Sequence, residues 1–262
     1  MNKIFIALLM SFLIFSSANA GTDDDNSLSK KNSGDVKECA EGFNKSMFAL
    51  NKSLDDAIFE PVAKVYRKLP SEIRNGTSNA LDNISNLLTI PNNILQGNIA
   101  EAGKNSARLI VNTTVGILGI FDVASELGVE KSGKEDYGQT LGVWGVGPGC
   151  YLVLPILGPS TARDAIGSFA SLGTGLDPWY NITVRNDTHH FADFDYYSSR
   201  VSSALDFRAK NIESLDNLEK NSVNFYASVK SLYLQDKNKK ISNSTSITET
   251  QNDSDWEEIE TE

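Results

Sequence analysis

The sequence contains few of the residues on which most enzymes and metal sites depend. Of its 262 residues, two are cysteine and two are histidine, and the histidines, His189 and His190, are adjacent. Adjacent side chains diverge on a helix or a strand, so the two rings are poorly placed to hold one ion. The chain has no nucleophile elbow, zinc-binding helix motif or phosphate-binding glycine loop. The sequence therefore predicts no catalytic residues, no metal site and no cofactor.

An excess of positive charge is also absent. Acidic residues outnumber basic ones by 34 to 24, which gives a formal net charge of −10. Nucleic-acid binding depends on cationic side chains that neutralise phosphates. The composition therefore argues against a nucleic acid as a partner.

Charge is missing altogether from the stretch 137–162, YGQTLGVWGVGPGCYLVLPILGPSTA. A membrane-spanning helix needs about 20 apolar residues, so the length would suffice. Six glycines and three prolines interrupt it, however, and both residue types disfavour a helix interior. The segment is predicted to be apolar without being one helix. Such backbone is either buried beside a cavity in a membrane protein or a buried loop of a soluble protein.

The two ends of the chain are predicted to lie outside the folded domain. Residues 1–20 carry Lys3, a short apolar run and the small-residue site Ala18-Asn19-Ala20, which together indicate a secretory signal peptide. Residues 21–38 are predicted to be a disordered lead-in, and the polar, acid-ended stretch 237–262 a disordered tail. One domain is expected over 39–236.

Apolar residues at steps of three and four predict amphipathic helices in the first half of this domain. One helix is expected from Phe43 to Leu69, with Pro61 kinking or splitting it. A second begins at Ser71 and is broken at 89–91, and a third runs from 92 to about 110. The stretch 112–127 is predicted to be a buried or interfacial helix.

The C-terminal part of the domain has a near-heptad rhythm from Phe194 to Leu232. This pattern favours one long or gently broken helix, and a helix hairpin bent near Asp216-Asn217 is the alternative. Sustained period-two alternation is absent, and YLVL at 151–154 is too short to found a sheet. The predicted fold class is all-α.

The two cysteines, Cys39 and Cys150, allow two interpretations. In an exported protein they can form a disulfide, which would tie the start of the domain to the glycine- and proline-rich segment. Two isolated thiols are the alternative.

Four blocks of the chain resemble the MlaA (VacJ) family of outer-membrane proteins. They are FNKSMFALNKSLDDAIFEPVAKVYRKLP (43–70), PNNILQGNIAEAGKNSARLIVNTTVGILGIFDVASELG (91–128), DYGQTLGVWGVGPGCYLVLPILGPSTARDAIG (136–167) and RAKNIESLDNLEKNS (208–222). The resemblance covers nearly the whole predicted domain. The third block is the most specific, and it has Cys150 where the family usually has proline.

The resemblance implies a single helical domain whose interfacial helices form a ring around a central channel in the inner leaflet of the outer membrane. Such a protein takes mislocalised phospholipids from the outer leaflet and passes them to a periplasmic carrier protein, with an outer-membrane porin trimer as a further partner. Many members carry a lipid on a cysteine directly after the signal peptide. That position here is Gly21, so this chain is expected to be exported but not lipidated.

Within this interpretation, the uncharged segment and the arginine after it line the lipid path. The candidates are Gly142, Trp144, Gly145, Gly147, Pro148, Tyr151, Pro155, Gly158, Pro159 and Arg163. The rings of Trp144 and Tyr151 would lie at the membrane interface, and Arg163 could meet a phosphate. The alternative is that both rings are core and that Arg163 pairs with Asp164. For the whole protein, the competing hypotheses are a soluble periplasmic interaction protein and a lipid hydrolase.

Overall fold

Helices form nearly all of the regular structure in the computed structural model, which describes residues 36–185 and 191–245. In chain order the elements are α2 (Glu41–Leu54), η1 (Asp55–Phe59), α3 (Glu60–Tyr66), α4 (Ser71–Leu95), α5 (Ile99–Thr114), α6 (Val123–Glu126), α7 (Tyr137–Val143), β1 (Tyr151–Leu154), β2 (Gly158–Thr161), α8 (Ala162–Thr174), α9 (Pro178–Tyr180), η2 (Asn181–Arg185), α10 (Asp193–Lys210), α11 (Ile212–Asn221) and α12 (Phe225–Thr245). The predicted all-α class is confirmed. The predicted signal peptide, His189 and His190 lie outside the described residues.

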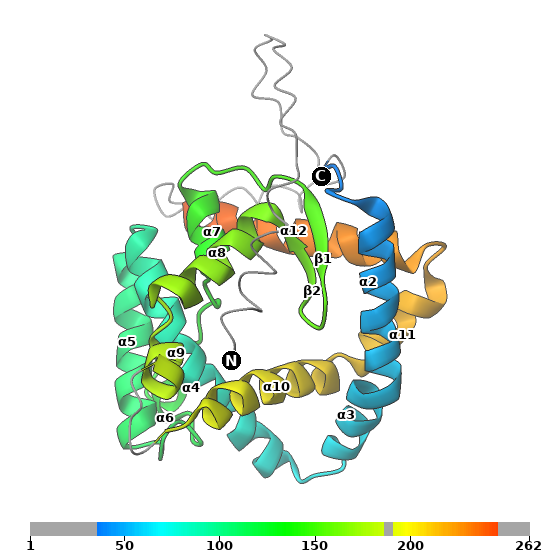
Figure 1. Ribbon diagram of the computed structural model, residues 1–262. Helices are drawn as coiled ribbons and strands as arrows, with labels where there is room; N and C mark the ends of the chain where they lie inside the picture. Colours follow the sequence, from blue (N-terminus) through cyan, green and yellow to red (C-terminus); the bar gives the residue numbers. More distant parts are fainter. Residues whose placement is uncertain (1–35, 186–190, 246–262) are drawn as a thin grey trace, which may run out of the picture. The chain divides into compact units, whose positions relative to one another are not determined.

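Packing contacts among these elements form a closed circuit. The circuit runs from α2 through η1 and α3 to α10, from there to α4, α7 and α12, and back through the β1–β2 hairpin to α2 (Figure 1). Helix α5 packs on α4, and α8 packs on α7. A closed circuit of this kind is what a ring of helices requires.

The first predicted helix is interrupted ahead of Pro61. Residues Asp55–Phe59 form a π-helical turn, and α3 then begins with Pro61 in its first turn. Proline is tolerated there because the first N–H groups of a helix have no intrahelical partner. The predicted interruption is confirmed, although the chain remains helical through it.

The break predicted at 89–91 is wrong, since α4 continues through Pro91 to Leu95. Proline inside a helix costs about 3 kcal/mol. Tertiary hydrogen bonds hold the last turns in place: Thr140 Oγ1 donates to Asn92 Oδ1 at 2.6 Å, and Asn105 Nδ2 donates to Asn93 Oδ1 at 2.9 Å. Contacts with α5 and α7 therefore offset the local cost of the proline.

The helix predicted over 112–127 is also wrong. Helix α5 ends at Thr114, and the chain turns back so that Gly119 N donates to Asn112 O at 2.7 Å. Ile117 and Leu118 have φ angles of 51° and 57° in this turn. Left-handed backbone is unfavourable for a β-branched residue such as Ile117, so pattern-based reasoning does not anticipate it.

The C-terminal region forms three helices, so the expected long or gently broken helix is divided at two places, and no bend falls at 216–217, which lies inside α11. The breaks fall at Asn211 and at residues 222–224. Next to the first break, Ala209 and Ile212 pack against Ala63 of α3 in a small core. The chain changes direction where it packs against α3. A heptad pattern contains no information about this contact.

Contacts of the described residues extend past both ends of the predicted domain, 39–236. Glu38 accepts hydrogen bonds from Tyr226 Oη at 2.7 Å and from Lys230 Nζ at 3.1 Å. At the other end α12 continues to Thr245, and Lys237 Nζ contacts Asp136 Oδ2 at 2.5 Å. Long-range charge pairs thus add residues at both ends to the folded domain.

The segment 137–162 contains α7 followed by an antiparallel hairpin, which confirms that it is not one helix. Strand β1 pairs with β2 from Tyr151 opposite Thr161 to Leu154 opposite Gly158. The expectation that YLVL is too short to form a sheet is therefore wrong. Contact with α2 supplies the stability that an isolated hairpin of four-residue strands lacks.

Two asparagines of α2 saturate the outer edge of this hairpin. Asn44 Nδ2 donates to Tyr151 O and Asn44 Oδ1 accepts from Val153 N, both at 3.0 Å. Asn51 repeats the pattern, donating to Leu154 O at 2.9 Å and accepting from Ile156 N at 2.7 Å. The two residues are seven apart, which places them on one face of a helix. Side-chain amides thus pair the backbone groups that an edge strand would otherwise leave open.

Cys39 and Cys150 form a disulfide whose Cα atoms are 5.1 Å apart. Beside it, Cys39 N donates to Tyr151 O at 3.0 Å, and Tyr151 N donates to Lys37 O at 2.8 Å. The structure thereby selects the paired alternative. The bond fastens the start of the domain to the first residue before β1.

Candidate functional site

The distribution of polar and apolar side chains is inverted relative to that of an ordinary soluble protein. Among the described residues, 11 buried side chains are hydrophobic and 21 are polar or charged, whereas 31 large hydrophobic side chains are exposed. Scattered exposed apolar residues are normal, but extended apolar surface marks contact with another apolar body. This inversion is the main property that any function must explain.

The polar interior is clearest between α4, α5 and α7, where buried amides bond to one another. Gln96 Nε2 donates to Thr140 Oγ1 at 3.0 Å, next to the Thr140–Asn92 bond. Asn105 continues the chain by accepting from Ser132 Oγ at 2.8 Å. Buried polar groups are stable when paired in this way. The facing surfaces of these three helices are therefore held by hydrogen bonds more than by apolar packing.

A buried ion pair closes the same region at its far end. Arg108 Nη2 contacts Asp122 Oδ1 at 2.7 Å, and Asn112 Nδ2 and Ser125 Oγ donate to the same carboxylate at 2.9 and 2.8 Å. Burial by itself raises the pKa of Asp122, but the hydrogen bonds from Asn112, Ser125 and Arg108 outweigh it and hold that pKa well below its usual value. Asp122 is thus a firmly ionised anchor for the turn after α5.

The same helices expose aliphatic side chains on their outer faces. The exposed large hydrophobic residues at the C-terminal end of α4, on α5 and in the turn after α5 are Ile94, Leu95, Ile99, Ile110, Val115, Ile117, Leu118, Ile120 and Phe121. We call this set the apolar rim. Leu118 has 71% of its surface exposed. Helices that bury amides and expose leucine and isoleucine are oriented for an apolar surrounding.

The tip of the β1–β2 hairpin is a second exposed apolar region, and its residues Ile156 and Leu157 are not among the candidates predicted from the sequence. Ile156 is 70% exposed and Leu157 is 69% exposed, and the φ angle of Ile156 is 67°. The strained Ile156 is held by its N–H bond to Asn51. Strained residues persist where the surrounding structure fixes them, and they cluster at functional sites. A sequence signal for Asn51 existed in its seven-residue spacing from Asn44.

The candidate residues of segment 137–162 are placed in three ways. Trp144 is 58% exposed, and its Nε1 donates to Leu95 O at 2.9 Å, so its ring borders the apolar rim. Gly145, Gly147 and Pro155 are exposed, whereas Pro148, Gly158 and Pro159 are intermediate. Gly142 is a contact glycine, since a Cβ there would lie 2.5 Å from Ile241 Cδ1 of α12.

The two remaining candidates, Tyr151 and Arg163, are buried. Tyr151 has no exposed surface and packs with Val153 and Leu234, so its expected place at a membrane interface is wrong. Arg163 Nε contacts the buried Asp164 at 3.0 Å. Tyr233 Oη donates to Asp164 at 2.5 Å, which ties this pair to α12. The alternative reading of Arg163–Asp164 as a local ion pair is therefore the one that the geometry favours.

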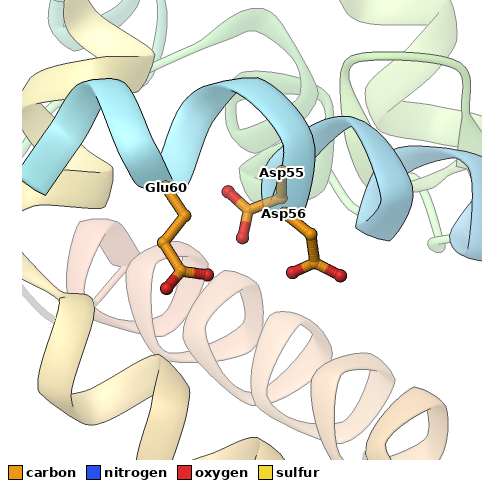
Figure 2. Close-up of side chains that lie close together, drawn as sticks. All are labelled: Asp55, Asp56 and Glu60. Carbon is orange, nitrogen blue, oxygen red and sulfur yellow. The ribbon is translucent and has the colours of Figure 1, made fainter.

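Three carboxylates gather at the π-helical turn, namely Asp55, Asp56 and Glu60 (Figure 2). Their oxygens are close enough for one cation, but protein cations already contact them. Arg208 lies 3.0 Å from Asp55 and 3.2 Å from Glu60, and Lys52 lies 2.5 Å from Asp56. This cluster is a charge network that joins η1 and α3 to α10. It gives no support to a metal site.

A small cavity of about 210 Å³ lies among α4, the residues before α7, α9, α10 and α12. Its lining is Leu81, Ile84, Ser85, Leu88, Thr89, Lys134, Glu135, Asp136, Gln139, Asp177, Trp179, Ser199, Arg200, Ser203 and Lys240. The wall combines an apolar strip from α4 with charged groups of both signs. None of these residues is among the candidates that the sequence predicts.

These features define an all-α protein with a polar interior and a large apolar contact surface. The family model of the MlaA lipoprotein matches residues 36–240. The chain therefore belongs to the MlaA lipoprotein family.

Relatives in several bacteria resemble the chain over much of its length. An uncharacterized protein of Rickettsia prowazekii, RP093, is 36% identical over 198 residues, which is 75% of each chain. The intermembrane phospholipid transport system lipoprotein MlaA of Escherichia coli K12 is 37% identical over 134 residues, 50% of this chain and 53% of that one. Its counterpart in Haemophilus influenzae is 30% identical over 170 residues, covering 63% and 64%.

One solved structure also matches, from a study described as "Structural basis for maintenance of bacterial outer membrane lipid asymmetry". It superposes with a TM-score of 0.66 at 29% identity and covers 78% of this chain and 99% of that one. Of the helices that the structure describes, none combines the length and the apolar character needed to cross a bilayer.

Proposed function

We propose that this chain is the outer-membrane component of a phospholipid transport system. In this role it removes mislocalised phospholipids from the outer leaflet and passes them to a periplasmic carrier protein, which maintains lipid asymmetry. The printed names of the E. coli and H. influenzae relatives, and the subject of the matching structure, support the phospholipid and the outer membrane as its setting.

The observation that carries the proposal is the inverted distribution of side chains. Burying one leucine or isoleucine contributes about 1.5–3 kcal/mol, so a rim of many such residues favours insertion among acyl chains. The helices that expose these residues turn buried amides and charges inward. A polar interior enclosed by an apolar exterior suits the passage of a headgroup through a lipid environment.

Fewer residues are retained as candidates for the wall of the lipid path than the sequence alone predicts. We retain Trp144, Gly145, Gly147 and the hairpin tip, because these parts are exposed and border apolar surface. Tyr151 and Arg163 are assigned to the supporting core. The tryptophan is an amphipathic ring of the kind favoured at a membrane–water interface.

Attachment to the membrane is proposed to rest on this apolar surface and on contact with a porin trimer. Gly21 stands at the position where many relatives carry a lipidated cysteine. Cys39, the cysteine nearer to the N-terminus, forms the disulfide with Cys150.

A deletion strain tests the proposal. Without the gene, phospholipid is expected to accumulate in the outer leaflet and detergent resistance to fall, and wild-type protein should restore both. Leu118→Asp and Ile156→Asp should restore them poorly, because each places a charge in the apolar surface. Asn75→Asp, a change at an exposed polar position, is the matched control.

Two outcomes would refute the proposal. One is an unchanged leaflet composition in the deletion strain. The other is recovery of the mature wild-type protein in the periplasmic extract without detergent, which would favour the soluble interaction protein. A lipid hydrolase would instead be indicated by fatty acid released from phospholipid by the purified protein.

A further inference from the structure

The cavity beside α7 contains one carboxylate, Glu135, that no ion pair of the described residues reaches. Asp136 pairs with Lys237 at 2.5 Å, and Asp177 pairs with Arg200 at 2.9 Å. Glu135 receives a hydrogen bond from the neutral amide of Gln96 at 3.0 Å, and among the described residues no ion pair reaches it. Burial, followed by the nearby Asp136 charge, raises its pKa above the usual value. Glu135 thus accepts one hydrogen bond, and within the described part of the chain Lys237 and Lys240 act on it only through longer-range charge.

A buried acceptor without a hydrogen-bond partner among the described residues lies in the same wall. Gln139 is 2% exposed, and its Oε1 has no hydrogen-bond partner within the described part of the chain. Its Nε2 donates to Asp136 Oδ2 at 3.1 Å and to Lys134 O at 3.3 Å, which fixes the orientation of the amide. An unsatisfied buried acceptor costs about 1–3 kcal/mol. The Gln139 oxygen and the Glu135 carboxylate would both accept from a ligand that donates several hydrogen bonds, as an ammonium does.

Cations occupy other positions in the lining. Arg200 uses one guanidinium nitrogen for Asp177 while its side chain is half-exposed, whereas Lys134 and Lys240 pair with Asp82 and Asp236 at 2.7 and 2.8 Å. A guanidinium has five N–H donors in a planar fork that matches a phosphate. The cavity therefore offers acceptors for a cation and donors for an anion.

The size and the remaining wall limit what such a ligand can be. A cavity of about 210 Å³ is smaller than the roughly 300–1,000 Å³ of sites for drug-sized ligands. It can hold a headgroup but not two acyl chains. Leu81, Ile84 and Leu88 of α4 form an apolar strip along one side, since residues three and four apart share a helix face.

We propose that this cavity binds the zwitterionic headgroup of a phospholipid, a primary ammonium joined by two carbons to a phosphodiester. The ammonium contacts Glu135 and Gln139, the phosphate contacts Arg200, and the glycerol lies along the strip of α4. This inference rests on the proposed function, because it names the class of lipid that the transporter selects.

Lipid competition with the full-length mature protein in detergent micelles tests this site. The probes are dioleoyl phosphatidylethanolamine and dioleoyl phosphatidylglycerol, offered together and quantified by native mass spectrometry. Wild type should favour the ammonium lipid. In Glu135→Gln the preference should fall about tenfold, in line with the strength of hydrogen bonds to charged groups. Glu130→Gln, at an exposed glutamate outside the lining, should leave it unchanged.

A second arm separates a lipid from a soluble source of the same chemistry. Glycerophosphoethanolamine and glycerophosphoglycerol are titrated into the same proteins by calorimetry. Binding of the soluble ammonium compound that depends on Glu135, without any lipid bound, supports the site but overturns its lipid source and the transport role. Equal binding of both lipids by wild type overturns the headgroup site and leaves transport standing.

Failure of wild type to bind either lipid or either soluble headgroup overturns both proposals. An identical preference in Glu135→Gln and Glu130→Gln overturns the site. Glu135→Gln should fold normally, because it removes a charge that burial disfavours, and circular dichroism checks this. Gln139→Met, which removes the second acceptor, is expected to weaken the same preference independently.

Discussion

Removal of the Cys39–Cys150 disulfide is predicted to destabilise the domain strongly. The two cysteines are 111 residues apart, and a closed loop of about this length restricts the unfolded chain by about 4.7 kcal/mol in the chain-entropy model. For a domain of this size each kcal/mol shifts the melting temperature by about 2–4 °C. The double variant Cys39→Ser/Cys150→Ser should therefore melt about 10–20 °C below wild type.

Thermal unfolding followed by circular dichroism measures this shift, with the full-length mature protein in one detergent. Wild type treated with a reductant should melt together with the double variant, whereas the reductant should leave the double variant unchanged. Alkylation followed by mass spectrometry should find no free thiol in the untreated wild type. Free thiols there, or equal melting temperatures for wild type and double variant, would refute the reasoning.

Three further predictions concern stability. Gly138→Ala should lower the free energy of unfolding by about 1–3 kcal/mol, because its Cβ would lie 2.7 Å from Asp164 Cα; Gly147→Ala, with open space around it, should be nearly neutral, and equal effects in a denaturant titration would contradict the packing argument. Asn44→Ala should cost about 1–3 kcal/mol by leaving Val153 N unpaired, whereas Ser46→Ala on the exposed face of α2 should cost little; a similar loss in both would exclude the edge-pairing role. Because the pKa of Asp122 is lowered in the folded state, its contribution is present above the unfolded value near 3.8 and is lost as pH falls; unfolding measured from pH 6 to pH 3 should show a smaller acid-dependent loss in Asp122→Asn, and parallel curves would count against the Arg108 cluster as an anchor.

Much of the chain's character could be inferred from residue order alone. The lack of catalytic motifs, the all-α class and the irregular nature of 137–162 follow from composition and local backbone preference. The family blocks were recognisable because their glycines, prolines and asparagines recur at set spacings. Asn44 and Asn51, which later prove to pair the hairpin edge, stood within the first block.

Helix ends and the hairpin could not be inferred in the same way. Pro91 is a local stop signal, yet side-chain hydrogen bonds with α5 and α7 stabilise the turns of α4 that follow it. The heptad rhythm after Phe194 is a local helix signal, yet the chain changes direction at Asn211 beside the Ala63 contact. In each case the deciding partner lies far away along the chain, and a periodicity count registers only neighbours.

The inverted distribution of polar and apolar side chains is the property that the local sequence pattern predicts least well. An amphipathic helix has the same sequence pattern whether its apolar stripe faces a protein core or a lipid, so the pattern from 92 to about 110 predicts a helix without orienting it. Packing settled the orientation, because polar side chains that are paired with each other, such as Asn92 and Thr140, lose less when buried than unpaired ones do. The residue order thus supplied helices with two faces, and the long-range hydrogen bonds chose which face points inward.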